Sequence, residues 1–225
     1  MLNRLRIPGL GGWSEDPLWG HFYDWSVEHP RVGGALWRLG IGSDLNRLYE
    51  AAAEIGALPA GSTVLDVPCG GGVALRGLKP GQGVRYVAAD ISDLMLRRTM
   101  DAARERGVED QVESAITDVH QMQFADGDFD LVVSFTGLHC FPDPHRALLE
   151  MGRVTKVGGV LTGSTLIKDS LGSRPLHAAG QAAGLLGPGV YEREIHAWTA
   201  EAGYDDVTVD VSGFMAYFRG VRAEG

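Results

Sequence analysis

Short apolar runs alternate with amphipathic segments along most of the chain. From Thr63 onward, five of these runs have the length and β-branched content of buried strands. The expected strands cover residues 63–67, 85–90, 112–116, 129–135 and 160–166, with a turn at 156–159 before the last of them. This alternation is typical of βα units, which build a parallel sheet covered by helices.

Segments with helical periodicity lie between several of these strands. The sequence predicts helices over 92–106, 144–154 and 191–202, and a first crossover helix that opens at 72–78. Ser92 is placed to cap its helix, which would present Met95 on its inner face.

The last two apolar runs, 206–212 and 214–221, follow each other almost without a gap. No crossover helix fits between them, so they must pair as an antiparallel hairpin. The prediction is therefore an α/β fold with a mostly parallel sheet whose last strand is antiparallel.

Two segments stand outside this frame. Residues 1–58 contain four tryptophans and then a helix that Ser43 would cap, with Leu45, Leu48, Ala52 and Ile55 along one side. Residues 167–190 are rich in Gly and Ala and read as an irregular insertion into a core of 59–225. Open α/β sheets bind ligands beyond the carboxyl ends of their strands, and both segments are expected to cover that edge of a single structural domain.

Composition narrows the possible functions. At 225 residues the chain is long enough for one domain with a sizeable core, and its net charge of −9 without a Lys/Arg cluster argues against a nucleic-acid partner. No apolar run is long enough to span a membrane, and the histidines lack metal-ligand spacing. Cys69 and Cys140 are too few for a disulfide framework, so both are expected to be reduced in a cytoplasmic protein.

The glycine-rich stretch VLDVPCGGGVAL, residues 64–75, is the strongest candidate motif. The stretch does not match a phosphate-binding P-loop, because Leu78 stands where lysine is required. Its match to a dinucleotide-binding fingerprint is incomplete, because Leu75 takes the place of the third glycine.

A third template fits better. Asp66, Gly70 and Gly72 match the pattern D-x-G-x-G-x-G, with Pro68 in place of the first glycine, where a cis or rigid turn could provide the same bend. Over about residues 60–166 the chain resembles the class I S-adenosylmethionine-dependent methyltransferases, type 11 group, which include the ubiquinone/menaquinone-biosynthesis methyltransferases. This resemblance implies a Rossmann-like sheet with helices on both faces, an N-terminal helical lid at 1–58, and S-adenosylmethionine as cofactor.

The resemblance also implies roles for individual residues. Gly70 and Gly72 would let the backbone approach the methionine part of the cofactor, and Asp66 would orient this loop or accept from the ammonium group. Asp90 would take the ribose hydroxyls, and Asp118 would meet the adenine amino group. The remaining predicted cofactor contacts are Tyr23, Pro68, Cys69, Ile91, Met95, Val119 and Ser134.

His139 follows the strand 129–135 and resembles a histidine often found there in this family. It would either take a proton from an acceptor hydroxyl or shape the pocket. The aromatic residues Trp19, Phe22, Trp25 and Trp37 suggest an apolar cover for a small acceptor, methylated on oxygen or carbon. Two alternatives stay open, a nicotinamide-dependent oxidoreductase on a related sheet and a non-catalytic S-adenosylmethionine-binding protein. The protein is expected to be a monomer or a homodimer.

Overall fold

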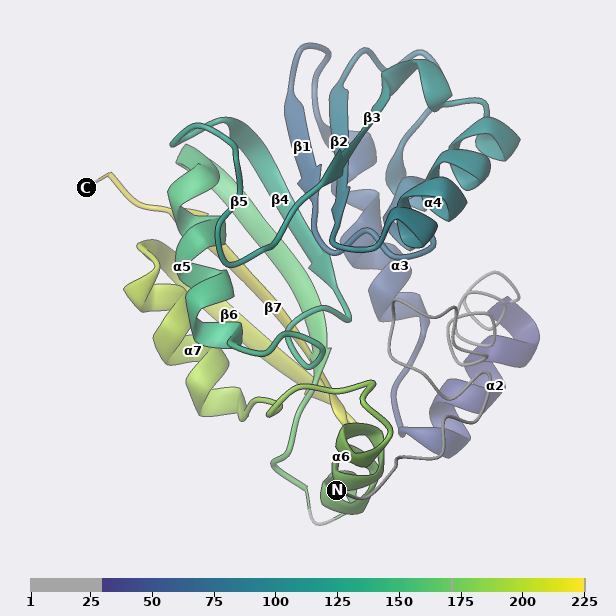
Figure 1. Ribbon diagram of the computed structural model, residues 1–225, viewed down its shortest axis with the longest axis vertical. Helices are drawn as coiled ribbons and strands as arrows, with labels where there is room; N and C mark the ends of the chain where they lie inside the picture. Colours follow the sequence, from purple (N-terminus) through teal and green to yellow (C-terminus); the bar gives the residue numbers. More distant parts are fainter. Residues whose placement is uncertain (1–29, 171, 225) are drawn as a thin grey trace, which may run out of the picture.

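A seven-stranded sheet forms the centre of the protein in this computed structural model, which describes residues 30–170 and 172–224. The strand order is β3-β2-β1-β4-β5-β7-β6 (Figure 1). The strands are β1 (Thr63–Asp66), β2 (Arg85–Asp90), β3 (Val112–Ile116), β4 (Phe129–Phe135), β5 (Thr155–Leu166), β6 (Tyr204–Ser212) and β7 (Met215–Arg222). β1 to β5 pair in parallel, whereas β7 pairs antiparallel to both β5 and β6, as the hairpin prediction requires.

Helices cover both faces of the sheet. They are α2 (Pro30–Gly40), α3 (Asn46–Ala53), α4 (Asp93–Arg106), α5 (Pro144–Val154), α6 (Ser173–Ala182) and α7 (Glu192–Glu201), with short 3-10 turns η2 (Ile55–Ala57), η3 (Val73–Gly77) and η4 (Glu109–Gln111). Because side chains alternate across a strand, Val64 packs with α3 and α4, while Leu65 packs with α5 and α7. The expected three-layer α/β fold is confirmed.

Four local expectations were wrong. The segment 72–78 forms only the 3-10 turn η3, in which Gly77 lies so close to α3 that a Cβ there would overlap the backbone carbonyl of Ala52. Residues 156–159 belong to β5, which begins at Thr155 with a register shift against β4 and a left-handed Gly158. The insertion after β5 is not irregular throughout, since it contains α6.

The fourth wrong expectation concerns the helix caps. Ser43 does not cap α3; its Oγ lies 3.1 Å from the hydroxyl of Tyr217, and Asp44 Oδ1 accepts from the backbone N–H of Asn46 instead. Ser92 precedes α4 as expected but makes no side-chain cap hydrogen bond. The predicted inner face of α3 is confirmed, because Leu45, Leu48, Ala52 and Ile55 are all buried.

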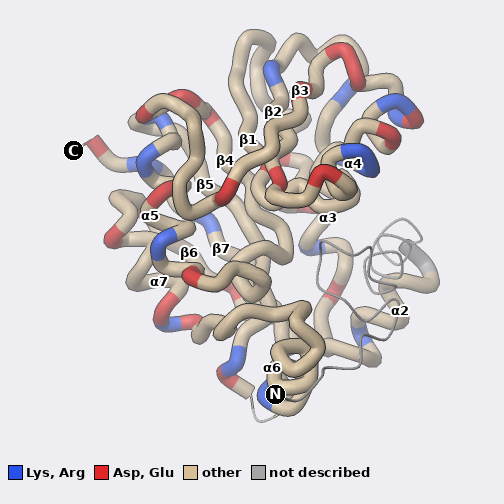
Figure 2. The backbone as a smooth tube through the Cα atoms, in the orientation of Figure 1, with Lys and Arg blue, Asp and Glu red and all other residues tan. Residues whose placement is uncertain are grey.

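The distribution of charged residues and the length of the helices can be compared with the expectations from the sequence. Figure 2 shows Lys and Arg interspersed with Asp and Glu over the helices and loops. Across residues 30–170 and 172–224, none of the helices is both long and apolar enough to cross a membrane.

Candidate functional site

The loop after β1 turns sharply at the carboxyl edge of the sheet. The Val67–Pro68 peptide is cis, and Gly70 and Gly72 have left-handed φ angles of 51° and 86°. The backbone N–H of Cys69 donates to the carbonyl of Ala89 on β2 (2.9 Å), which ties the loop to the neighbouring strand. Glycine adopts such φ values without the penalty that other residues incur.

The two glycines serve different purposes. A Cβ on Gly72 would meet Cδ1 of Leu75 at 3.1 Å and Cα of Thr99 at 3.3 Å, so this glycine allows the loop to pack against α4. A Cβ on Gly70 would have no neighbour within 4 Å and would project into open space. Only Gly70 therefore leaves room for a ligand at the loop surface.

Asp66 ends β1 inside the protein. Its side chain is buried, and its Oδ2 accepts a hydrogen bond of 2.6 Å from the hydroxyl of Tyr86 on β2. Burial raises the pKa of Asp66 to about 7, against the opposing effect of the Tyr86 hydrogen bond, and the nearby Asp90 charge raises it further. Asp66 thus lies below the loop, and with a pKa of about 7 it changes its protonation state near neutral pH.

Asp90 ends β2 directly beside the same loop. Its Oδ2 accepts from the backbone N–H of Gly70 (3.1 Å), and its Oδ1 accepts from the N–H of Ser92 (2.9 Å). Burial raises the pKa of Asp90, while these amide hydrogen bonds lower it. One carboxylate therefore links the glycine loop to the start of α4.

Cys69 and Met95 are buried beneath this loop, and Pro68 is half-buried. The hydroxyl of Thr99 lies 2.7 Å from the carbonyl oxygen of Gly70 and 3.4 Å from Sγ of Cys69. Burial raises the pKa of the Cys69 thiol, which disfavours a reactive thiolate. These side chains support the loop from below.

An open cavity of about 360 Å³ lies at the ends of β2 and β3. Its lining residues are Ile91, Ile116, Thr117, Asp118, Gln121 and Gln123. Ile91 and Ile116 are 70% and 68% exposed, which is unusual for aliphatic side chains at a strand end. Two exposed apolar side chains near a carboxylate suit a flat, partly apolar ligand.

Asp118 provides the charge of this cavity. Its Oδ1 accepts from the backbone N–H of His120 (2.9 Å) and lies 2.6 Å from Nδ1 of the same histidine. The backbone hydrogen bond of His120 is the main reason that the pKa of Asp118 lies below its usual value. Val119 differs from its neighbour, because its side chain is buried in the core.

Ser134 near the end of β4 and His139 after this strand are both buried. Ser134 Oγ has no hydrogen-bond partner among the described residues, and a Cβ on Gly137 would lie 2.7 Å from it. The backbone N–H of Leu166 donates to Nδ1 of His139 (3.1 Å), and Thr165 Oγ1 lies 3.0 Å from the same nitrogen. Because Nδ1 accepts a hydrogen bond from the Leu166 amide, it carries no proton itself. The neutral ring therefore has its proton on Nε2.

The charge state of His139 is equally constrained. Burial lowers the pKa of His139 to about 3, and the charge that His177 on α6 would carry lowers it as well. The ring is therefore neutral at physiological pH and offers an N–H rather than a lone pair at Nε2.

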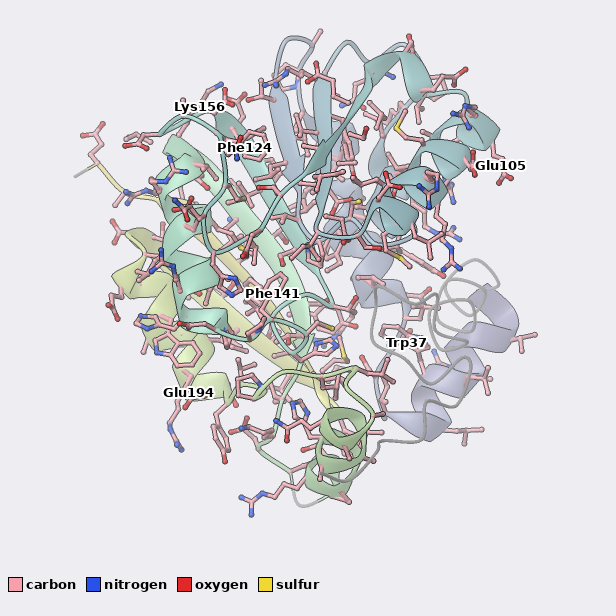
Figure 3. The ribbon with its side chains drawn as sticks, in the orientation of Figure 1. Trp37, Glu105, Phe124, Phe141, Lys156 and Glu194 are labelled. Carbon is pink, nitrogen blue, oxygen red and sulfur yellow. The ribbon has the colours of Figure 1, made fainter. Side chains whose placement is uncertain are left out.

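The predicted site residues thus gather at the carboxyl ends of β1, β2, β3 and β4. Tyr23, together with Trp19, Phe22 and Trp25, lies outside the described residues, while Trp37 is buried in the core beside α3 (Figure 3). Sequence reasoning missed Tyr86, Thr99 and His120, which hold Asp66, the glycine loop and Asp118. Two of them had a signal: Tyr86 lies on the same strand as Asp90, and Thr99 lies on the same face of its helix as Met95.

Residues 65–162 match the family model of the methyltransferase domain. The match begins in β1 and ends in β5, so it includes the glycine loop, Asp90, Asp118 and His139. Residues 65–162, just under half of the chain, are thus similar to a methyltransferase domain.

Curated relatives include named methyltransferases. The chain is similar to the 27-O-demethylrifamycin SV methyltransferase of Amycolatopsis mediterranei, with 28% identity over 65% of this chain and 52% of that protein. It is also similar to the ubiquinone/menaquinone biosynthesis C-methyltransferase of Hydrogenovibrio crunogenus, with 32% identity over 52% of this chain and 47% of that protein. The chain spans about half the length of these relatives.

Solved structures share the fold. A possible exported protein from Bordetella parapertussis has a TM-score of 0.73 at 18% identity, covering 91% of this chain and 79% of that chain. A [4+2]-cyclase, SpnF, has a TM-score of 0.65 at 20% identity, covering 81% of this chain and 83% of that chain. The same sheet therefore serves more than one named activity, and the site decides the chemistry.

Proposed function

We propose that this protein transfers a methyl group from S-adenosylmethionine to a small, apolar acceptor, on oxygen or carbon. The observation that carries the proposal is the arrangement of Gly70 and Asp90. Gly70 leaves open space above the loop, and its backbone N–H donates to the Asp90 carboxylate and holds it beside that space. The methyltransferase domain match over the same residues supports it.

The residues at the strand ends suit the three parts of this cofactor. Gly70 leaves space for the methionine part, and Asp66 beneath it supplies a carboxyl group that would favour an ammonium group nearby. Asp90 would accept from the ribose hydroxyls with the lone pairs that Gly70 and Ser92 leave free. Asp118 and the exposed Ile91 and Ile116 would hold the adenine.

The helix N-terminus expected after the glycine loop takes no part in this proposal. The segment is only the five-residue turn η3, so the carboxylate of the methionine part would meet the loop rather than the end of a long helix. The side chains of Cys69, Met95 and Ser134 would support the site from inside, because all three are buried.

S-adenosylmethionine would supply a methyl group on a positively charged sulfur. The acceptor, after losing its proton to solvent, would take the methyl group by in-line displacement, and neutral S-adenosylhomocysteine would leave. The protein's main task is then to align the two reactants, an effect that reaches about 7–11 kcal/mol in favourable systems. In this site His139 would donate from Nε2–H to an acceptor oxygen and orient it, because its Nδ1 already accepts from Leu166. This favours the pocket-shaping role of His139 over that of a general base.

The acceptor class rests on two supports. The relatives are named for 27-O-demethylrifamycin SV and for ubiquinone/menaquinone biosynthesis, and they methylate oxygen and carbon by name. Leu138 and Phe141, which lie close to His139 in the sequence, are apolar and buried. We place the reaction in the cytoplasm, where the free thiols of Cys69 and Cys140 would stay reduced.

An acceptor screen tests the proposal. Purified protein is incubated with S-adenosylmethionine labelled in the methyl group and with matched panels of lipophilic phenols, quinols and small polar amines. We expect label in the phenol or quinol panel. Label in the amine panel alone would contradict the acceptor class, and binding of the cofactor without turnover in any panel would favour a non-catalytic S-adenosylmethionine-binding protein.

A further inference from the structure

His120 connects Asp118 to the start of α5. Its ring Nδ1 lies 2.6 Å from Asp118 Oδ1, and the backbone N–H of Asp143 donates to its Nε2 at 3.4 Å. Because Nε2 accepts, the neutral ring carries its proton on Nδ1 and donates it to Asp118. The histidine therefore links an exposed carboxylate to the first turn of α5.

The ring is held more firmly than the carboxylate. The His120 side chain is 17% exposed, whereas that of Asp118 is 55% exposed. Phe141 packs against the ring edge-on, with 6.2 Å between centroids, and lies in the loop before α5 (Figure 3). Arg146 on α5 donates from Nε to the carbonyl of His120 at 3.0 Å, which fixes the backbone as well.

This arrangement leaves the two oxygens of Asp118 unequal. Both hydrogen bonds from His120, through its backbone N–H and its ring, go to Oδ1. Oδ2 is the oxygen left for a ligand in the cavity that Asp118 lines with Ile91 and Ile116. A carboxylate fixed in this way accepts from an amino group and repels a carbonyl oxygen in the same position.

We propose that His120 is a positioning residue that fixes Asp118 so that its Oδ2 selects a purine bearing an exocyclic amino group. This inference rests on the proposed function, because it assigns the adenine part of S-adenosylmethionine to this cavity. His120 acts through Asp118 and needs no contact with the cofactor itself.

The test compares two ligands that differ at position 6 of the base and in the proton that the inosine base carries on the adjoining N1. S-adenosylhomocysteine carries the amino group, and S-inosylhomocysteine carries a carbonyl oxygen. Calorimetric titration of the full chain gives the affinity for each, and their ratio is the discrimination. Thermal unfolding of every variant checks that it folds.

Three variants separate the possible roles. His120→Leu removes the ring donor, and His120→Asn places an amide nitrogen where Nδ1 stands. His145→Leu is the matched control, because His145 also pairs with an exposed carboxylate, Glu201 at 3.1 Å, but on the side of α5 that faces α7. A hydrogen bond to a charged group corresponds to about tenfold or more in affinity.

We expect the parent chain, His120→Asn and His145→Leu to prefer S-adenosylhomocysteine by at least about tenfold, and His120→Leu to lose most of this preference. Equal loss of affinity for both ligands in His120→Leu would overturn the inference, because it indicates a purely structural role. Unchanged discrimination in His120→Leu would overturn it too. Failure of the parent chain to bind S-adenosylhomocysteine would refute the proposed function and the inference together.

Discussion

The backbone N–H of Gly70 donates to Oδ2 of Asp90 across the ends of β1 and β2. The side chain that would contact a ribose is thereby also the side chain that holds the glycine loop. Loop position and carboxylate orientation are consequently coupled, since displacing either one breaks the same hydrogen bond.

Replacement of Asp90 should weaken cofactor binding strongly. Asp90→Asn keeps the size of the side chain but replaces one acceptor oxygen with a donor, so it cannot accept from Gly70, Ser92 and a ribose together. We expect the affinity for S-adenosylhomocysteine to fall by about tenfold or more in calorimetric titration. Asp101→Asn is the control, because Asp101 is an exposed carboxylate on α4. Equal affinities for parent and Asp90→Asn would exclude the ribose role.

The two glycines should respond differently to alanine. Gly72→Ala should lower the free energy of unfolding by more than the 1–2 kcal/mol or so that a left-handed conformation costs an L-residue, because its Cβ also meets Leu75 and α4. Gly70→Ala should cost about that conformational penalty alone but abolish measurable cofactor binding. Urea denaturation and titration of both variants provide the comparison. A Gly70→Ala protein that binds as tightly as the parent would show that the loop surface is not the ligand site.

Asp66 should make the protein less stable as the pH rises through 7. Its pKa is about 7 in the folded state and near 3.8 when unfolded, so between these values the folded state binds a proton that the unfolded state lacks. The stability from this group is therefore complete below pH 3.8 and is lost as the pH passes the folded pKa, with a slope of up to about 1.4 kcal/mol per pH unit.

Asp66→Asn tests this dependence, because an amide oxygen still accepts from Tyr86. Urea denaturation of parent and variant between pH 5 and pH 8 should show a smaller decline in the variant. Burial also raises the pKa of Asp90, but Asp90 is present in both proteins and contributes to the pH dependence of both. Parallel curves for the two proteins would mean that Asp66 is ionised throughout.

His139 should remain neutral with its proton on Nε2 over the working pH range. Long-range proton–nitrogen NMR distinguishes the two tautomers, and we expect the Nε2–H pattern without titration between pH 5 and pH 8. His139→Asn keeps an acceptor for the Leu166 amide, so it should bind S-adenosylhomocysteine like the parent and slow transfer once the acceptor is known. A ring that titrates near pH 6.5 would restore the general-base role.

Much of the sheet could be predicted because its strands are bounded by clear signals. The strands 85–90, 112–116 and 129–135 and the helix 144–154 match the structure residue for residue. Each is a continuous or periodic apolar segment between turn residues or a proline. The antiparallel direction of the last strand followed from the missing crossover before it.

The contacts that organise the site could not be predicted in this way. His120 depends on the N–H of Asp143, 23 residues away, and His139 on the N–H of Leu166, 27 residues away. Only the folded backbone brings such groups together. The helix expected at 72–78 is only the turn η3, and the close contact of its Gly77 with Ala52 of α3 is likewise absent from the local sequence pattern.

Calorimetric titration of the purified chain with S-adenosylhomocysteine, and in parallel with NAD and NADP, tests the central claim most directly. We expect micromolar binding of S-adenosylhomocysteine and no heat of binding from either nicotinamide cofactor. Binding of NAD or NADP without S-adenosylhomocysteine would contradict it and would assign the glycine loop to an oxidoreductase.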